Sequence, residues 1–461
     1  MRQTVATLGV VALLLLAGCG SLLGGQGTGT PADTDVSTAE PTDEPTDERT
    51  AASGATASPT STPASTPTAT ATETATATPT ATATVTPSPT PAPKETHTDE
   101  PDVELRGGNL SVDEDAVYAD VQELLGTDVE PPTVYVRDRM AGLERYNERL
   151  AQNPFYDAFG YGDTFVNTSV YHGQTTRERI VVMPSDANAT QQKTLLAHEY
   201  VHWLQFHGDI VDTGEFGQFV DDADSQQVAA GLVEGASVYV TDRYVDRYLN
   251  TSWNQTQELR TQYRNGPAGR RLFRARYLFG AQYIHSQVES PRNVSWLYDR
   301  STPTPVTSEQ LVHGYTPSEE PERNLTLAVN GSERWRYPYD HYDTQGEIVV
   351  RTMLRAELNR STAATAAAGW GTDKIARLRH ADDASRTAFA WALRWDDPEE
   401  ADEFAAAFET WRAARPTDDG TAYRLARVGD GTTVVFAGSE SFVADAAAAG
   451  TAGNVTVSVA G

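Results

Sequence analysis

The sequence predicts an α+β fold in which a mixed sheet packs on one central helix and a mostly helical part follows it. The central helix is indicated by residues 190–207, which lack glycine and proline and space their apolar residues with a helical period. Two runs rich in β-branched residues, Thr133–Arg137 and Arg179–Met183, precede it and are typical of strands. Further runs with helical periodicity follow it, so we expect the sheet to be built before this helix and most helices after it.

The segments before the central helix alternate between helix and strand. The expected elements are a helix over Asp113–Leu125, the strand Thr133–Arg137, a helix to Leu150, and strands at Thr164–Asn167 and Arg179–Met183. Asp186 or Asn188 is expected to cap the central helix, because a short polar side chain at that place accepts from the first backbone N–H groups.

The segments after the central helix are predicted to be mainly helical. We expect a helical run from Gly231 to about Leu249, helical segments over 252–290 with a break at Gly266-Pro267, helices at 344–360, 361–368 and 397–415, and a strand near 387–395. A hairpin is expected at Gly429-Asp430-Gly431, between Tyr423–Val428 and Thr432–Phe436.

The central helix carries the pattern His198-Glu199-Tyr200-Val201-His202. Residues four apart share one face of a helix, so both imidazoles can reach the same metal ion. Glu199 follows the first histidine directly, where its carboxylate can hold a water molecule at that metal. The alternative is a core helix whose two histidines are satisfied by other contacts.

A zinc site with two histidines needs a third protein ligand and leaves a position for water. The metzincin layout is excluded, because Gln205 and Gly208 stand where it needs a glycine and a histidine. Glu234 is the better candidate, since it is an acid in the apolar part of the next helical run, where an unpaired carboxylate is costly. The alternative is a salt bridge from Glu234 to Arg243 or Arg247. The other nearby acids are expected to face solvent: Glu215, Asp221, Asp222 and Asp224.

The first twenty residues have the pattern of an export signal. Arg2 is followed by the apolar stretch Val10–Leu16 and then by Leu16-Ala17-Gly18-Cys19, which is typical of a lipobox. Cleavage there leaves Cys19 as a lipid-carrying N-terminus; an uncleaved anchor helix is the alternative. We therefore expect a lipoprotein signal peptide at 1–19, a disordered stalk at 20–100, a folded domain at 101–415 and a small β-rich tail at 416–461.

The composition suits an exported surface protein. The formal net charge is −28, and only three of the 36 basic residues are lysines, which resembles proteins of halophilic archaea. Such a charge keeps a surface hydrated and argues against nucleic-acid binding. The stalk is built mostly from Thr, Pro, Ala and Ser and cannot bury a core.

Asparagine is concentrated in N-glycosylation triplets. Ten of the 13 asparagines begin N-x-S/T, whereas about three are expected by chance. The predicted glycosylation sites are Asn109, Asn167, Asn188, Asn250, Asn254, Asn293, Asn324, Asn330, Asn359 and Asn454.

Several segments beyond the metal motif follow a recurring order. They are Glu234-Gly-Ala-Ser-Val-Tyr239, Tyr277-x-x-Gly280-x-x-Tyr283, Thr307–His313, Ala367–Asp373, and Trp395-Asp396 with Ala401 and Phe404. With His198–His202, they resemble gluzincin metallopeptidases of the peptidase-MA-like group over about residues 105–415. With the lipobox, stalk and acidity, the whole chain resembles haloarchaeal surface lipoproteins.

The resemblance implies a zincin-like fold and a Zn²⁺ ion held by His198, His202 and Glu234. It implies hydrolysis of a peptide or protein substrate, with Glu199 as the general base. An oxyanion donor is also expected. The candidates are Tyr239, Tyr277, His285 and His313, of which His313 is preferred because it follows a proline-rich loop and a polar string.

Two other functions compete with a lipid-anchored zinc metallopeptidase outside the cell. One is a non-catalytic glycosylated surface protein that retains a zincin fold, which a damaged motif would favour; here the motif is intact. The other is a solute-binding lipoprotein, which shares the membrane anchor and the stalk but leaves the His-Glu-x-x-His pattern unexplained.

Overall fold

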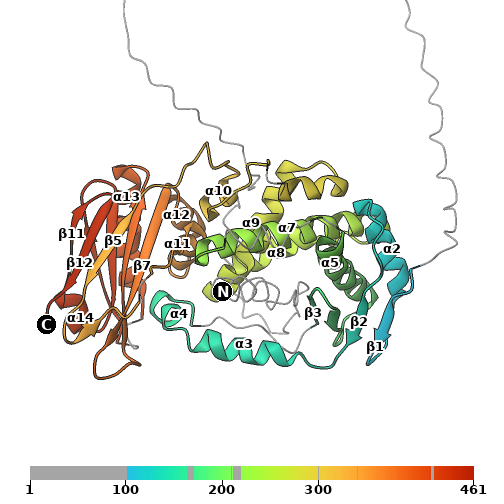
Figure 1. The fold of residues 1–461 in the computed structure, drawn as a ribbon, viewed down its shortest axis with the longest axis horizontal. Helices are drawn as coiled ribbons and strands as arrows, with labels where there is room; N and C mark the ends of the chain where they lie inside the picture. The colour runs from blue at the N-terminus through green and yellow to red at the C-terminus, as the bar shows by residue number, and fades with distance from the viewer. Residues whose placement is uncertain are drawn as a thin grey trace, which may run out of the picture. The chain divides into compact units, whose positions relative to one another are not determined.

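The structure, a computed structural model, describes residues 101–162, 171–208, 210, 220–299, 301–339, 341–416 and 420–461. Within these ranges the chain is mixed α/β, with helices and three sheets (Figure 1). The predicted signal peptide, Cys19, the stalk, the strand at Thr164–Asn167 and Glu215 lie outside the described residues.

The first sheet precedes the central helix, as the sequence predicts. Its strand order is β1-β2-β4-β3, where β1, β2 and β4 are parallel and the edge strand β3 is antiparallel to β4. The bounds are β1 Glu104–Arg106, β2 Thr133–Val136, β3 His172–Thr175 and β4 Ile180–Met183. The predicted β2 and β4 are confirmed, whereas β1 and β3 are not among the expected strands.

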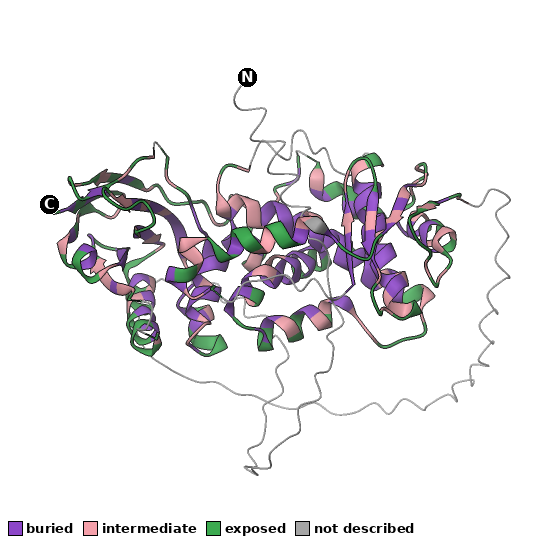
Figure 2. Cartoon of the chain, turned by 90° about the horizontal axis from the view of Figure 1, so that it is seen from below, coloured by how far each residue is buried: buried purple, intermediate pink, exposed green. Residues whose placement is uncertain are grey.

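Two long helices form the centre of the first half of the described chain. α5 (Ala189–His207) and α7 (Ala223–Tyr248) pack side by side (Figure 1) and are buried along most of their length. Figure 2 shows the buried residues in purple along the helices and strands of the interior. The other helices are α2 Glu114–Leu125, α3 Ala141–Ala151, α4 Pro154–Phe159, α8 Gln255–Asn265, α9 Ala268–Gln287, the 3₁₀ helix η2 Pro291–Tyr298, α10 Ser308–His313, α11 Glu347–Leu354, α12 Arg360–Thr365, α13 Pro398–Ala414 and α14 Glu440–Asp445.

The predicted helices α2, α3 and α5 are confirmed, and so is the break between α8 and α9 at Gly266-Pro267. α7 begins earlier than Gly231, because Asp222 forms a capping box with Ser225. One expectation for the acidic connector is therefore wrong. Asp224 is buried in the first turn of α7, where it accepts from the backbone N–H of Ser308.

The C-terminal part contains more strands than the sequence predicts, although α7 to α14 still cover more residues after α5 than β5 to β12 do. A five-stranded antiparallel sheet has the order β6-β7-β8-β10-β9, and a three-stranded sheet the order β11-β12-β5. The bounds are β5 Thr326–Asn330, β6 Trp335–Arg336, β7 Trp370–His380, β8 Thr387–Trp395, β9 Ala422–Arg427, β10 Thr432–Gly438, β11 Ala446–Thr451 and β12 Asn454–Val459. The hairpin between β9 and β10 is confirmed. Because β10 also pairs with β8, the predicted boundary at residue 415 falls inside one sheet.

Strand β8 separates two hydrophobic cores. Ala388, Ala390 and Ala392 pack into a core with β5, β12 and α14, while Phe389, Trp391 and Leu393 belong to the main core. A strand that is buried on both faces carries apolar residues at every position, which is why this segment is recognisable as a strand.

None of the described helices combines the length and apolar character that crossing a bilayer requires.

Candidate metal centre

α5 presents the sequence motif toward α7. Asn188 begins the helix in a capping box with Gln191, which confirms one of the two predicted caps. The helix is buried from Thr194 to Gln205, so the imidazoles of His198 and His202 are only 1% and 2% exposed. The local sequence thus places two histidines on one buried helical face.

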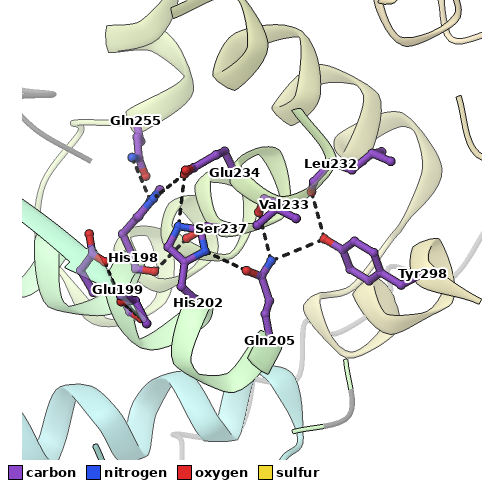
Figure 3. Close-up of polar contacts among 11 residues, drawn as sticks. His198, Glu199, His202, Gln205, Leu232, Val233, Glu234, Ser237, Gln255 and Tyr298 are labelled. Carbon is purple, nitrogen blue, oxygen red and sulfur yellow. Dashed lines mark hydrogen bonds and ion pairs between the residues drawn. The ribbon is translucent and has the colours of Figure 1, made fainter. Parts of the chain in front are cut away.

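α7 supplies the third side chain. Glu234 is 3% exposed and lies opposite the two histidines (Figure 3). The hydroxyl of Ser237, one turn further along, donates to the backbone oxygen of His198 at 2.8 Å, which ties the two helices together at this level. The salt bridge considered from the sequence, between Glu234 and Arg243 or Arg247, is wrong, since Arg243 pairs with Asp246 and Arg247 with Glu123.

Both histidine side chains approach the same carboxylate oxygen of Glu234. His198 Nε2 lies 3.3 Å and His202 Nε2 lies 3.2 Å from Oε2 of Glu234. Two ligands about 2.0–2.1 Å from one tetrahedral ion are roughly 3.3–3.4 Å apart. A charged N–H···O hydrogen bond is shorter, about 2.7–2.9 Å. The spacing therefore fits three ligands of a shared metal ion better than a direct ion pair, and this buried group can bind a metal.

The outward nitrogens of both histidines face amide side chains. His202 Nδ1 lies 2.8 Å from Oε1 of Gln205, and the Gln205 amide in turn donates to Val233 O and approaches the Tyr298 hydroxyl (Figure 3). Gln205 Oε1 can accept the Nδ1 proton of His202, and Nε2 is the ring nitrogen that faces Glu234.

His198 is oriented in a similar way by Gln255 at the start of α8. Nε2 of Gln255 lies 3.2 Å from His198 Nδ1, and its Oε1 is buried without a hydrogen-bond partner among the described residues. Turning the amide by half a rotation places that oxygen at Nδ1, where it accepts the imidazole N–H and frees Nε2 for a metal. The sequence gives no signal for Gln255 or Tyr298, because both are distant from the motif along the chain.

The carboxylate of Glu199 lies against the edge strand β3. Thr175 Oγ1 lies 2.7 Å from Oε2 of Glu199, while Oε1 is buried without a hydrogen-bond partner in the described chain. Gly173 leaves the space for this carboxylate, because a Cβ atom there would overlap it. Glu199 therefore has one anchored oxygen and one free oxygen.

The surroundings shift the pKa values of Glu199 and Glu234 in opposite directions. Burial raises the pKa of Glu199, although the nearby imidazoles of His202 and His198 lower it in part. Burial also opposes ionisation of Glu234, but the two imidazoles outweigh it, so the pKa of Glu234 is lowered. At His202 burial lowers the pKa, yet the Glu234 carboxylate more than compensates and raises it to about 9. Glu234 is thus the anionic member of the group, and Glu199 is the carboxylate more ready to take a proton.

The glycines of the recurring segments bring α7 and α9 into backbone contact. A Cβ at Gly280 would overlap the backbone of Gly231, and a Cβ at Gly235 would lie 2.6 Å from the backbone nitrogen of Ala281. Since Gly235 follows Glu234 directly, this close contact between the helices fixes the position of Glu234 relative to α9. Packing thus accounts for the glycines in two of the segments.

His313 is not brought to the metal group by its described contacts. Its Nε2 lies 3.0 Å from Oε2 of Glu347, which also pairs with Arg351, and its ring stacks on Tyr315. The oxyanion role of His313 stays a prediction.

The other oxyanion candidates also contact different partners in the described chain. The Tyr239 hydroxyl donates to Val288 O, and the Tyr239 ring lies edge-on to exposed His285. Tyr277 is fully buried in the main core.

The sequon asparagines are accessible wherever the structure describes them. Asn254 is partly exposed, and the other eight are exposed: Asn109, Asn188, Asn250, Asn293, Asn324, Asn330, Asn359 and Asn454. Asn167 lies outside the described residues. Where such an asparagine caps a helix, as at Asn188 and Asn359, its side chain acts as an acceptor, so the amide nitrogen is not used by the cap.

Comparison with known proteins gives one family match. A family model described as a domain of unknown function (DUF8575) matches residues 335–456, which span β6 to β12 and lie outside the metal group. No curated protein and no solved structure matches the chain.

Proposed function

We propose that this chain is a zinc metallopeptidase of the gluzincin type, with a zincin-like arrangement of β1–β4, α5 and α7. The observation that carries the proposal is the convergence of His198, His202 and Glu234 at the spacing of ligands on one ion. The donor set of two imidazoles and one carboxylate is the one that catalytic zinc sites use, with a fourth position left for water.

Zinc bound by these residues would supply Lewis acidity, polarising a peptide carbonyl and lowering the pKa of a water molecule. Glu199 is suited to the proton transfer that follows. Its Oε2 is held by Thr175, its Oε1 is unpaired among the described residues, and burial favours its protonated form. It can take a proton from the attacking water and pass it to the leaving amine.

The edge strand β3 supports a peptide as the substrate class. Among the residues that the structure describes, β3 lies at the end of its sheet and pairs with β4, and an extended peptide is the kind of ligand that adds to the edge of a sheet through its backbone groups. Gly173 and Thr175 of this strand contact Glu199, so a peptide added there would run beside the general base.

We further propose that the mature protein is exported, anchored to the outer face of the membrane by lipid on Cys19, and N-glycosylated. The lipobox and stalk carry the first two statements. The exposure of the described sequon asparagines supports the third. Mass measurement of the mature N-terminus tests the lipid on Cys19.

The test combines metal content with cleavage. Purified protein in concentrated KCl is expected to hold one zinc ion per chain and to cleave a mixed peptide library. Glu199→Gln should keep the zinc and lose cleavage by roughly 10²- to 10⁴-fold, because it removes the proton acceptor but no ligand. Glu234→Gln should lose the zinc as well, while Glu148→Gln, an exposed glutamate on α3, should match the wild type.

Zinc bound without any Glu199-dependent cleavage would rule out the peptidase. It would favour the alternative, a non-catalytic glycosylated surface protein that retains the fold.

A further inference from the structure

A second group of chemistry-bearing residues surrounds α10, the helix that contains the Thr307–His313 segment. Its polar side chains have defined partners with one exception. Thr307 caps Gln310, the hydroxyl of Ser308 accepts from Ile348 N, the Gln310 amide donates to Glu320 O, and His313 pairs with Glu347. Glu309 is the exception.

Glu309 is a largely buried acid. The residue is 4% exposed, and the described part of the chain shows no hydrogen bond or ion pair to its side chain. A buried charge in that position is costly unless something neutralises it. The electrostatic neighbours are also acidic: Glu347, Asp396, Glu320 and Glu400.

Two of these neighbours converge with Glu309. One carboxylate oxygen from each of Glu309, Glu320 and Asp396 lies within 4.8 Å of the others. Oxygen ligands about 2.3–2.6 Å from one Ca²⁺ ion are at most roughly 5 Å apart, so the three fit a single coordination sphere. Arg323 holds Oδ1 of Asp396 at 2.7 Å and is the one cation described in contact with the group.

We propose that Glu309, Glu320 and Asp396 bind a Ca²⁺ ion, with water filling the remaining positions. All three ligands are hard oxygen donors, which suits Ca²⁺ and disfavours zinc. The irregular origin of the ligands, from a helix, a loop and a strand end, suits the flexible sphere of Ca²⁺ better than the strict octahedron of Mg²⁺.

The ion would join two parts of the described chain. Glu309 is on α10 and Glu320 is in the following loop, whereas Asp396 lies between β8 and α13 in the segment that matches the domain of unknown function. α10 also packs on α7, since Leu311 lies against Gly231 and Ser308 binds Asp224. The Ca²⁺ site would therefore support the helix that carries Glu234 without taking part in zinc chemistry.

The alternative occupant is a proton. Burial, together with the neighbouring carboxylates, raises the pKa of Glu309 to about 10, so this side chain keeps a proton at neutral pH when no cation is present. If a proton neutralises Glu309, the protein does not need to bind Ca²⁺ here, whereas the proposed site binds one Ca²⁺ per chain.

The experiment is equilibrium dialysis of the whole protein against radiolabelled Ca²⁺, in concentrated KCl with zinc kept saturating. The wild type is expected to bind one Ca²⁺ per chain. Glu309→Gln and Glu320→Gln should each weaken binding by roughly 10- to 100-fold or more, because each removes a charged ligand. Glu403→Gln, an exposed glutamate on α13 outside the group, should bind as the wild type does.

Folding of the variants is checked by thermal unfolding. Without Ca²⁺, Glu309→Gln should unfold no lower than the wild type, because the substitution removes a buried acid, and its midpoint should not respond to added Ca²⁺. Glu199→Gln should bind Ca²⁺ normally, so failure of the peptidase proposal leaves this result intact.

Three outcomes would overturn the proposal. They are a wild type that binds no Ca²⁺, binding that both Glu309→Gln and Glu320→Gln retain, and a preference for Mg²⁺ when both ions are supplied at equal concentration.

Discussion

At the level of single residues, the position of Glu199 depends on Gly173, which has no side chain. Gly173 stands at the centre of β3, and the Glu199 carboxylate fills the space above it. Gly173 is not among the glycines with a positive φ, so it is needed here for space rather than for its conformational freedom.

We predict that Gly173→Ala impairs cleavage while zinc binding persists. The added methyl group displaces the Glu199 carboxylate and leaves His198, His202 and Glu234 in place. Turnover is expected to fall by roughly 10²-fold, since a misplacement of about 1 Å has that effect. The control is Gly162→Ala, whose Cβ makes only an ordinary contact of 3.5 Å with Asp157, and equal losses in both variants would contradict the reasoning.

The sequence predicts that His198, His202 and Glu234 form one group, because the pattern that identifies each of them lies within a short segment. His198 and His202 are fixed by a spacing of four, and Glu234 by an acid in an apolar helical run. Gln255, Tyr298 and Gly173 are outside the reach of such reasoning, because their roles depend on which segments the fold brings together.

At the element scale, the crossing of α7 and α9 is set by glycines that face each other. Helices whose backbones touch require small residues at the point of contact. Gly231 and Gly235 on α7 meet Gly280 on α9 in this way.

We predict that Gly280→Ala destabilises the protein and weakens zinc binding together. The new methyl group overlaps the backbone of Gly231, so the helices must separate at the level of Glu234. Overpacking of this kind costs about 1–3 kcal/mol. Chemical denaturation and zinc titration measure the two effects, and an unchanged zinc affinity in a destabilised variant would show that the crossing does not position Glu234.

Helices are more predictable than strands in this chain. α5, α8 and α9 show their period or a proline break, whereas β7 alternates buried Ala376 and Leu378 with arginines and gives a weak signal. β11 begins with four alanines, which are strong helix formers, and becomes a strand because it pairs with β12. Tertiary contacts override local preference in such segments.

At the scale of the whole molecule, acidity dominates. With a net charge of −28, the acidic side chains repel one another at low ionic strength. This repulsion adds to the free energy needed to ionise a buried acid. Burial raises the pKa of Asp242 and of Asp373 to about 6.

We predict that stability falls as pH rises from about 5 to about 7.5 in low salt. An acid whose folded pKa is raised keeps its proton in the folded chain after the unfolded chain has lost it, so raising the pH through that window favours unfolding. Glu234 and Glu347 have lowered pKa values, and their contributions are lost only below their ordinary value of 4.5. Their titration therefore does not affect this range.

The measurement is the thermal midpoint at both pH values with zinc saturating, in dilute and in concentrated KCl. Salt should raise the midpoint and reduce the pH dependence that arises from surface repulsion, because the screening length falls to about 3 Å at 1 M. Asp242→Asn should flatten part of the remaining slope. A midpoint that rises between the two pH values would contradict the assignment.

The two-faced strand β8 has a consequence for how the C-terminal half assembles. Alanines face one side and Phe389, Trp391 and Leu393 the other, and successive side chains of a strand point in opposite directions. A slip of one residue against β7 or β10 would drive indole and phenyl rings into a gap sized for methyl groups. Misaligned pairings of this strand must therefore come apart before either interior can close, and the correct alignment is selected by volume rather than by polarity.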